Sequence, residues 1–564
     1  MENKEYMLID GNPVEINGEK NLLEVIRKAG IELPTFCYHS ELSVYGACRM
    51  CMVENSHGGM EAACSTVPKA GMEIYTNTER LHKHRKMILE LLLANHCRDC
   101  TTCQKNGKCR LQELASLFGL ESIRFKNLKP EPELDTSSLS IIRDAHKCIL
   151  CGDCVRMCNE IQNVGAIDFV NRGSKMVIGP AFNEPIANSP CVGCGQCAAV
   201  CPTGAIVIRK DTGRVWPELN DKNTKVVAQV APAVRVAMAK EFGLPENENS
   251  MGRITAALRR LGFDEVYDTA TGADLTVLEE SNEFLQRIEA GENLPLITSC
   301  CPAWIQYCEK NHPELMKNIS TCKSPMQMFS SVIKAEYANS SRRVVCVAVM
   351  PCTAKKFECA REEFMHDGVP ETDYVITTQE LIQMIHKAGI VFDELEPEAV
   401  DSVFSTCTGA GVIFGVTGGV TEAVLRRLST DKSNKALMSI AFNDVRGMKG
   451  VKETTIPYGD KEVRIAIVSG LKNAEKVIQA LKNGEHFDFI EVMACPGGCV
   501  AGGGQPFGTN ATKEVRGKAL YSADKMLSIK RSEENPLMLS LYDGVLKGRV
   551  HELLHVHYNH KEEE

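Results

Sequence analysis

The chain has 564 residues, of which 44% are hydrophobic and 24% charged, and its formal net charge is −9. This length is too great for one hydrophobic core, and the composition is typical of a globular protein with roughly three to five domains. The mild acidity argues against a nucleic-acid-binding surface. We find no secretion signal, no twin-arginine leader and no apolar run of the roughly 18 residues that a membrane span needs, so we expect a cytoplasmic protein without a membrane segment.

Cysteine is the most informative residue type. The chain has 26 cysteines, and 16 of them lie before residue 202. Disulfides are not expected in a long chain without a secretion signal, whereas closely spaced CxxC pairs indicate metal binding. The cysteine spacings are therefore examined as ligand sets, in chain order.

Residues 1–80 are predicted to form a β-grasp ferredoxin-like domain. Two short strands, 6–10 and 14–16, flank a Gly-Asn-Pro turn, and a helix follows that ends at Gly30. The apolar positions of this helix are Leu22, Leu23, Val25 and Ile26. The next cysteines have the spacing C-x10-C-x2-C-x12-C, which supplies the four thiolates of a [2Fe–2S] cluster but differs from the plant-type spacing. A zinc site is the alternative for the same set. The set is Cys37, Cys48, Cys51 and Cys64.

Residues 81–126 are predicted to be helical and to hold a [4Fe–4S] cluster with one histidine ligand. His96, Cys100, Cys103 and Cys109 have the spacing H-x3-C-x2-C-x5-C. Imidazole is an unusual but chemically sound fourth ligand. The adjacent Cys97 competes with His96 for that role, and the spacing alone does not choose between them.

Residues 127–210 are predicted to be a ferredoxin domain with two [4Fe–4S] clusters. A connector rich in Pro, Glu and Ser at 127–145 precedes two C-x2-C-x2-C-x3-C runs, and Pro202 follows the second run. In bacterial ferredoxins of this type the fourth cysteine of each run ligates the other cluster. The two predicted ligand sets are Cys148, Cys151, Cys154 and Cys201 for one cluster, and Cys191, Cys194, Cys197 and Cys158 for the other.

Residues 211–530 are predicted to be an α/β domain, and residues 531–564 a separate helical tail. Short β-branched runs at 226–230, 344–350, 465–468 and 489–493 are typical of buried strands. Cys352 and Cys495 directly follow two of these runs, and the carboxyl ends of parallel strands are where α/β proteins build sites. The glycines at 497, 498 and 502–504 would let the backbone approach a bulky ligand. The pattern predicts a buried cofactor ligated by cysteine.

Three segments of this domain resemble the signature motifs of [FeFe]-hydrogenases: Thr298-Ser-Cys-Cys-Pro-Ala-Trp304, the stretch Met350–Glu358, and the stretch Glu491–Pro506. The order of the N-terminal cluster sites is similar to that of the monomeric clostridial type. The resemblance also favours His96 as the ligand over Cys97. It implies an H-cluster, which is a [4Fe–4S] cubane joined to a di-iron unit that carries CO, cyanide and an azadithiolate. Together with the N-terminal sets, this makes one [2Fe–2S] cluster, three [4Fe–4S] clusters and the H-cluster.

The resemblance also implies roles for individual residues. The cubane ligands would be Cys301, Cys352, Cys495 and Cys499, with Cys499 bridging to the di-iron unit. Lys355 would hydrogen-bond a cyanide, Met350 would pack at the bridging CO, and the cofactor would be lined by Ala231, Pro232 and Ser324. Cys300 would exchange protons with the azadithiolate amine. The proton route to the surface would then use Glu280, Ser320, Glu283 and Arg287.

One position departs from the family pattern, since Met326 stands where glutamine is usual. We expect this change to affect catalytic bias or the response to oxygen, without removing a ligand. Five cysteines have no ligand spacing and are expected to be buried thiols. These are Cys308, Cys322, Cys346, Cys359 and Cys407.

Two further segments resemble a nucleotide-binding motif and a zinc-protease motif, and neither is expected to have that function. The glycines of the 409–415 segment fit a nucleotide fingerprint poorly and are better explained by helix packing. The His551-Glu-Leu-Leu-His555 segment matches the zinc-protease motif, but too few residues follow it to complete such a site, and the tail resembles the small subunit of the hydrogenase family.

The resemblance implies a ferredoxin hydrogenase that interconverts protons and H2, with ferredoxin or flavodoxin as electron partner and with separate maturation proteins for the di-iron unit. The alternatives are a hydrogen sensor, an iron–sulfur assembly factor and a non-catalytic electron-transfer protein. The complete H-cluster cysteine set argues against an electron-transfer protein, and Cys300 with Lys355 argues against an assembly factor. A sensor would usually carry a PAS-type regulatory domain, and none is evident in the sequence.

Overall fold

The computed structural model describes residues 5–127, 133–429, 445–458 and 461–558, and the chain divides into two compact units. The first comprises residues 1–161, 165–189 and 200–207, and the second comprises 162–164, 190–199 and 208–564. Part of the predicted connector, residues 128–132, lies outside the described ranges. Within those ranges no helix is both long and apolar enough to cross a lipid bilayer.

The first unit begins with the predicted β-grasp arrangement. A mixed sheet with strand order β2-β1-β5-β3-β4 packs against helix α1, whose four apolar residues are all buried. The Asn21 side chain accepts a hydrogen bond from the N–H of Glu24 and starts this helix, and Gly30 ends it at φ 81°. The elements are β1 (Glu5–Ile9), β2 (Asn12–Ile16), α1 (Leu22–Lys28), β3 (Met52–Asn55), β4 (Met60–Ala62) and β5 (Glu73–Tyr75).

Helices and short strands complete the first unit. The predicted helical region contains α2 (Glu79–Ala94) and α3 (Arg110–Leu117), whose inner faces share a core with Phe36 and Met50. Two small ladders accompany the ferredoxin-type cysteine runs, β6 with β9 and antiparallel β7 with β8. The bounds of these elements in the first unit are β6 (Ile141–Arg143), α4 (Asp153–Arg156), β7 (Asp168–Val170), β8 (Val177–Gly179) and β9 (Ile206–Ile208). The short helix α5 (Gln196–Val200), which carries Cys197, lies in the second unit except for its last residue.

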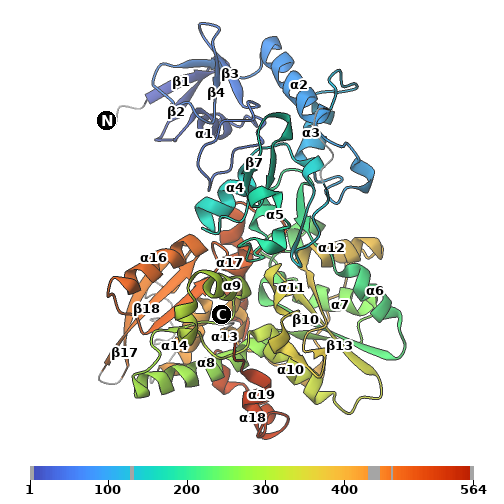
Figure 1. Cartoon of the computed structure of the whole chain (residues 1–564), viewed down its shortest axis with the longest axis vertical. Helices are drawn as coiled ribbons and strands as arrows, with labels where there is room; N and C mark the ends of the chain where they lie inside the picture. Colours follow the sequence, from blue (N-terminus) through green and yellow to red (C-terminus); the bar gives the residue numbers. More distant parts are fainter. Residues whose placement is uncertain (1–4, 128–132, 430–444, 459–460, 559–564) are drawn as a thin grey trace. The chain divides into compact units, whose positions relative to one another are not determined.

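The second unit contains two four-stranded sheets, which lie to either side of it in Figure 1. The first has the order β11-β10-β13-β16 and is entirely parallel. The second has the order β12-β19-β18-β17, in which only the β17–β18 pair is antiparallel. The strands of these two sheets are β10 (Thr224–Val230), β11 (Glu265–Asp268), β12 (Leu296–Ile297), β13 (Arg343–Met350), β16 (Tyr374–Thr377), β17 (Val451–Tyr458), β18 (Lys461–Ser469) and β19 (Phe489–Met493). A separate antiparallel pair is formed by β14 (Met365–His366) and β15 (Val369–Pro370).

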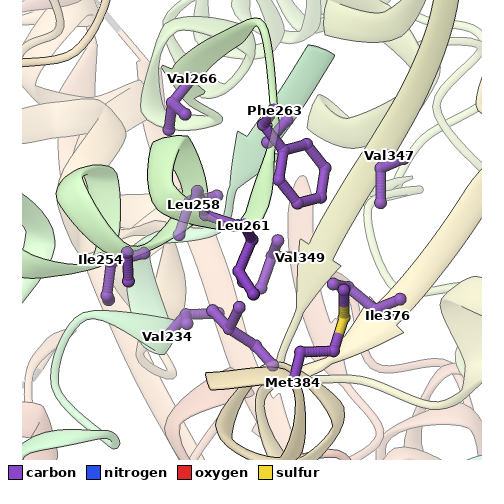
Figure 2. Packing of buried hydrophobic residues seen from close by; sticks show 14 of the residues in the cluster. Val234, Ile254, Leu258, Leu261, Phe263, Val266, Val347, Val349, Ile376 and Met384 are labelled. Carbon is purple, nitrogen blue, oxygen red and sulfur yellow. The ribbon is translucent and has the colours of Figure 1, made fainter. Parts of the chain in front are cut away.

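Helices cover these sheets and bury an apolar core on each. Figure 2 shows the core of the first sheet, where Leu258 and Leu261 of α7 lie against Val349 of β13. The first half of the long helix α8 is buried throughout, from Ala270 to Ser281. The helices are α6 (Thr212–Asn220), α7 (Met251–Leu261), α8 (Ala270–Ala290), α9 (Pro302–Asn311), α10 (Pro325–Glu336), α11 (Ala354–Glu358), α12 (Thr378–Lys387), α13 (Gly409–Val412), α14 (Gly419–Leu428), α16 (Leu471–Lys482) and α17 (Asn510–Met526).

The C-terminal tail is helical, as predicted, but it is not separate. It contains α18 (Pro536–Asp543) and α19 (Val550–Leu554), and its apolar residues join one core with Phe329 of α10. Asp274 of α8 also accepts hydrogen bonds from Ser532 (2.7 Å) and Asn535 (3.1 Å) of the tail. The reason is physical, because helices this short are not stable unless their apolar side is buried against a larger body.

Candidate active site and cluster sites

The second unit brings together the four cysteines expected to hold the cubane, and they come from three different segments of the chain. Cys301 precedes α9, Cys352 follows β13, Cys495 follows β19, and Cys499 lies four residues further on. Burial raises the pKa of Cys495 well above its ordinary value, and the charges of the other three thiolates raise it further. Burial raises the pKa of Cys352 to about 11, with Cys301 adding to the effect. Four thiols that disfavour one another's ionisation fit a shared cationic metal cluster, which would compensate their charge.

Two glycines after Cys495 lie against other protein backbone. A Cβ atom on Gly502 would lie 2.2 Å from the carbonyl oxygen of Pro351, and one on Gly498 would lie 2.6 Å from the backbone nitrogen of Thr417. These glycines therefore permit close approach of protein backbone, and the predicted approach to a ligand stays a prediction. Gly502 lets the segment after Cys499 pack against Pro351, which directly precedes Cys352.

A cavity of about 70 Å³ lies beside the four cysteines. It is lined by predicted site residues that follow strands of both sheets, and by Met326, which stands where the family usually has glutamine. The lining includes Ala231, Pro232, Cys300, Met326, Met350 and Lys355. Ser324 precedes the lining residue Pro325, and its buried hydroxyl has no hydrogen-bond partner among the described residues. An apolar chamber with a cation and an orphaned hydroxyl at its edge fits a compact, partly anionic cofactor.

Lys355 remains a cation in this apolar setting. Its Nζ lies 2.7 Å from Glu358 Oε2 and donates to the carbonyl oxygen of Cys300 over 3.3 Å. Burial lowers the pKa of Lys355, but the Glu358 carboxylate outweighs this and the net pKa is raised. Sequence analysis missed Glu358, although its position three residues after Lys355 in α11 was a usable signal.

Hydrogen bonds connect the outer three residues of the predicted proton relay, but within the described ranges they do not reach Glu280. The Ser320 hydroxyl donates to Glu283 Oε2 over 2.8 Å, and Arg287 donates to Glu283 Oε1 over 2.5 Å. Glu280 is fully buried on the same helix, and no described residue hydrogen-bonds its carboxylate with normal geometry. Burial raises its pKa to about 8, and the nearby Glu283 charge adds to the rise. At neutral pH Glu280 therefore holds a proton inside the protein.

Cys300 lies at the inner end of this series. Burial raises its pKa well above the ordinary value, and the Glu280 carboxylate is the next largest cause. The thiol is therefore protonated at neutral pH and faces the cavity. A protonated thiol at the cavity wall is a group that can donate a proton into the chamber.

Gln196 is a site residue that sequence analysis did not identify. Its side-chain amide donates to the Cys495 sulfur over 3.1 Å and to the Ala501 carbonyl oxygen over 2.9 Å. It directly precedes Cys197 of the second ferredoxin-type run. No local spacing rule relates residues 299 positions apart, so no sequence signal was available.

The first unit brings together one predicted [4Fe–4S] ligand set. Cys148, Cys151, Cys154 and Cys201 all line a cavity of about 20 Å³. Of the other set, Cys158 belongs to the first unit and Cys191, Cys194 and Cys197 belong to the second.

The cysteines of the β-grasp domain influence one another in two pairs, Cys37 with Cys48 and Cys51 with Cys64, and the Cys48 N–H donates a hydrogen bond to the Cys37 sulfur over 3.3 Å. The hydrogen bond from Cys37 lowers the pKa of Cys48 to about 6, while the pKa of Cys37 is raised. Two thiols per pair, buried in one loop region, fit a four-thiolate cluster.

In the one-histidine set, His96 is buried and its Nδ1 accepts a hydrogen bond from the N–H of Arg98 over 3.0 Å. The thiol of Cys97 lies 4.0 Å from the same nitrogen. The pKa of Cys100 is raised by burial, then by Cys103 and Cys97. Cys97 thus lies close to the other cysteines, and the choice of His96 as the fourth ligand stays a prediction.

Five family models match the chain. The model described as "Iron only hydrogenase large subunit, C-terminal domain" matches residues 224–503, and "Iron hydrogenase small subunit" matches 510–561. The others are a 2Fe-2S iron-sulfur cluster binding domain at 6–79, the NADH-ubiquinone oxidoreductase-G iron-sulfur binding region at 85–124 and a 4Fe-4S dicluster domain at 147–209. The chain therefore carries domains for both [2Fe–2S] and [4Fe–4S] clusters ahead of a hydrogenase domain.

Relatives extend over the whole chain. The "NADP-reducing hydrogenase subunit HndD" of Solidesulfovibrio fructosivorans is 41% identical, covering 98% of each chain. "Iron hydrogenase 1" of Clostridium pasteurianum is 35% identical, covering 98% of this chain and 99% of the relative. A solved structure of a variant of the [FeFe]-hydrogenase HydA1 from Chlamydomonas reinhardtii is 37% identical, with a TM-score of 0.54 over 62% of this chain and 98% of that one. Together with the cysteine-lined chamber of the second unit, these matches show that the chain belongs to the [FeFe]-hydrogenase family.

Proposed function

We propose that this protein interconverts protons and H2 at a di-iron site in the chamber beside Cys301, Cys352, Cys495 and Cys499. The observation that carries the proposal is the meeting of the protonated Cys300 thiol and the cationic Lys355 at one cavity wall. When bound, the H-cluster supplies the metal-hydride chemistry. Lys355 would hold an anionic ligand of that group, and Met350 with Ala231 and Pro232 would keep water out.

The residues of this chain would supply the protons. Cys300 would donate to the bound group, Glu280 would return a proton to Cys300, and Ser320 with Glu283 would link Glu280 to Arg287 near the surface. The hydrogen bonds of Ser320 and Arg287 to Glu283, and the buried protonated state of Glu280, support this order. Of these groups Glu280 has the pKa nearest the working pH, at about 8, and is therefore the one best suited to gain and lose a proton in each turnover.

We assign one [2Fe–2S] cluster and three [4Fe–4S] clusters to the N-terminal sets, with His96 as the fourth ligand of its set. The 20 Å³ cavity of the first unit supports the set that includes Cys201. Iron and acid-labile sulfide analysis of the matured protein tests this assignment. Full loading of these clusters and of the H-cluster would give about 20 iron atoms per chain. Separate maturation proteins in the cytoplasm would load the di-iron unit.

The electron partner has two candidates. Ferredoxin or flavodoxin is the first candidate, because the chain's own series of clusters could accept electrons directly from a small carrier protein. The second is NADP through a further subunit, which the name of the 41% identical relative favours. The glycines of the 409–415 segment support no nucleotide site in this chain, since a Cβ on Gly411 would lie 2.4 Å from the carbonyl oxygen of Ala270. A nucleotide would then be reduced by another chain.

Anaerobic assays of the matured protein test the proposal. Hydrogen evolution from reduced viologen, and from reduced ferredoxin, is expected. NADP reduction by the isolated chain with H2 is not expected, and its appearance only after a diaphorase-type subunit is added would favour the second partner. A protein with a complete H-cluster that neither evolves nor consumes H2 would contradict the proposal and favour a sensor.

A further inference from the structure

Three side chains of different chemistry meet where helix α8 faces the C-terminal tail. One ligand atom from each of Glu283, Cys322 and His555 lies within 4.8 Å of the other two. The Cys322 sulfur is 3.8 Å from Glu283 Oε2, and an isolated β-bridge joins Cys322 to His555. We propose that these three residues bind a borderline-soft divalent cation such as Zn²⁺, and that the bound ion interrupts proton transfer at Glu283. The site stands by itself, whereas its effect on proton transfer rests on the proposed function.

The donor set is one that zinc selects. Thiolate, imidazole and carboxylate are its protein ligands, and three of them with one water complete a tetrahedral site. With ordinary zinc–ligand bond lengths the donor atoms of such a site lie about 3.5 Å apart. Closing the observed group around an ion therefore requires side-chain movements of about 1 Å, well within rotamer adjustment. Binding releases the Cys322 thiol proton to solvent, and the two anionic ligands then balance the charge of the ion.

Neighbouring residues already orient the ligands. His555 Nε2 lies 3.1 Å from Glu279 Oε2, and Glu279 also accepts a hydrogen bond from the Tyr542 hydroxyl. A proton held on Nε2 by this carboxylate leaves the lone pair of Nδ1 for a metal, and Thr321 Oγ1 occupies that place at 2.9 Å. Carboxylate–histidine–metal arrangements of this kind fix the tautomer and the ring orientation of zinc ligands.

The position of the site explains its expected effect. Glu283 Oε2, which faces Cys322, is also the oxygen that accepts the Ser320 hydrogen bond. An ion on this oxygen would compete with the proton that the carboxylate has to carry. The side chains of Glu283 and His555 are 11% and 9% exposed, so an ion can enter from solvent although Cys322 is fully buried.

The zinc-protease-like segment is not the basis of this site. His551 is exposed, and Glu552 pairs with Arg549. Only His555 of that motif takes part, and its partners come from α8 and from the loop before α10. Cys322, expected from its spacing to be an ordinary buried thiol, becomes a ligand through tertiary structure alone.

Direct binding measurements test the site. The holoenzyme would be incubated anaerobically with ZnCl2 and desalted, and zinc and iron would be counted before X-ray absorption at the zinc edge. We expect one zinc per chain with one sulfur ligand and unchanged iron content. Cys322→Ala and His555→Asn should each lose the zinc, whereas Cys346→Ala, which removes another buried thiol of the same apolar cluster, should retain it. Zinc bound without sulfur, zinc kept by both variants or no zinc bound by the wild type would overturn the proposal.

Kinetics test the consequence separately. Zinc should slow hydrogen evolution by the wild type at least tenfold, reversibly with a chelator, and should not slow Cys322→Ala. Each protein is compared with its own zinc-free rate, so that any effect of Cys322→Ala on the rate without zinc does not enter the comparison. Zinc that binds with the expected sulfur but leaves the rate unchanged would overturn the proposed effect at Glu283. Absence of hydrogen evolution in zinc-free wild type would instead count against the proposed function and leave the site intact.

Discussion

The side-chain amide of Gln196 donates a hydrogen bond to the Cys495 sulfur over 3.1 Å. A residue beside a ferredoxin-type cysteine thus contacts a predicted ligand of the catalytic cubane. Hydrogen bonds to cluster sulfurs stabilise the reduced, more negative state and so raise the reduction potential.

Replacing this amide should change the cubane potential. Gln196→Leu is expected to shift it to more negative values, on the order of tens of millivolts, because the reduced cluster loses a donor. An anaerobic redox titration followed by electron paramagnetic resonance would measure the shift. Gln379→Leu is the matched control, since the Gln379 amide donates only to the backbone oxygen of Gln505 over 2.7 Å. Equal potentials in Gln196→Leu and the wild type would show that this hydrogen bond does not tune the cluster.

Glu280 should be needed for activity and should cost stability at high pH. Its pKa in the folded protein is raised from 4.5 to about 8. The folded state therefore binds a proton that the unfolded state has lost between these values, so this group makes the free energy of unfolding fall as pH rises through that window. Glu280→Gln cannot ionise and should escape this loss, by up to a few kcal/mol above pH 8.

The same variant should evolve hydrogen about 100-fold or more slowly, because an amide does not relay protons. Denaturant unfolding at pH 5 and pH 9 measures the first effect, and viologen-driven hydrogen evolution measures the second. A variant whose stability relative to the wild type does not change between the two pH values would mean that Glu280 has an ordinary pKa.

The ion pair of Lys355 with Glu358 should hold the cavity wall together. Glu358→Gln would leave a buried cation without its carboxylate, and we expect a loss of about 3–5 kcal/mol in the free energy of unfolding. The pKa of Lys355 should fall, and the cyanide bands in the infrared spectrum of the matured protein should move. Glu362→Gln, a change in the same region that removes no ion pair described here, serves as control. Unchanged stability and unchanged cyanide bands in Glu358→Gln would argue against this role.

The C-terminal tail should contribute to the stability of the second unit. Leu541 is buried in the core shared with Phe329, whereas Leu539 on the same helix is 66% exposed. Leu541→Ala should lower the free energy of unfolding by about 2–5 kcal/mol, and Leu539→Ala should change it by well under 1 kcal/mol. Thermal unfolding of the two variants would compare them directly. Equal effects would mean that the tail is bound only loosely.

Local sequence patterns predicted several of the strands of the second unit. The runs that became β10, β13, β18 and β19 were predicted because β-branched residues gather in short apolar stretches. The division into two sheets was not predicted, since pairing between strands far apart in sequence leaves no local trace. β12 has only two residues and gave no signal at all.

Cysteine spacing predicted the N-terminal cluster sets, because ligands that lie in one loop have short fixed separations, and the structure brings Cys148, Cys151, Cys154 and Cys201 to one cavity. Residues that act across the fold left no such trace. Gln196 reaches Cys495, and Cys322 meets His555, only through tertiary structure. The glycines at 498 and 502 were recognised as points of close approach, but the approaching partner is backbone, which sequence cannot identify.

Cys300 is proposed to deliver protons to the chamber, and its removal tests this role. Viologen-driven hydrogen evolution would be measured for Cys300→Ala beside Cys308→Ala, with the infrared bands of the H-cluster confirmed in both. Cys308 is also fully buried but is not among the residues that line the chamber. We expect a loss of at least about 100-fold for Cys300→Ala and near wild-type rates for Cys308→Ala. Full activity of Cys300→Ala with an intact H-cluster would rule out this role of the thiol.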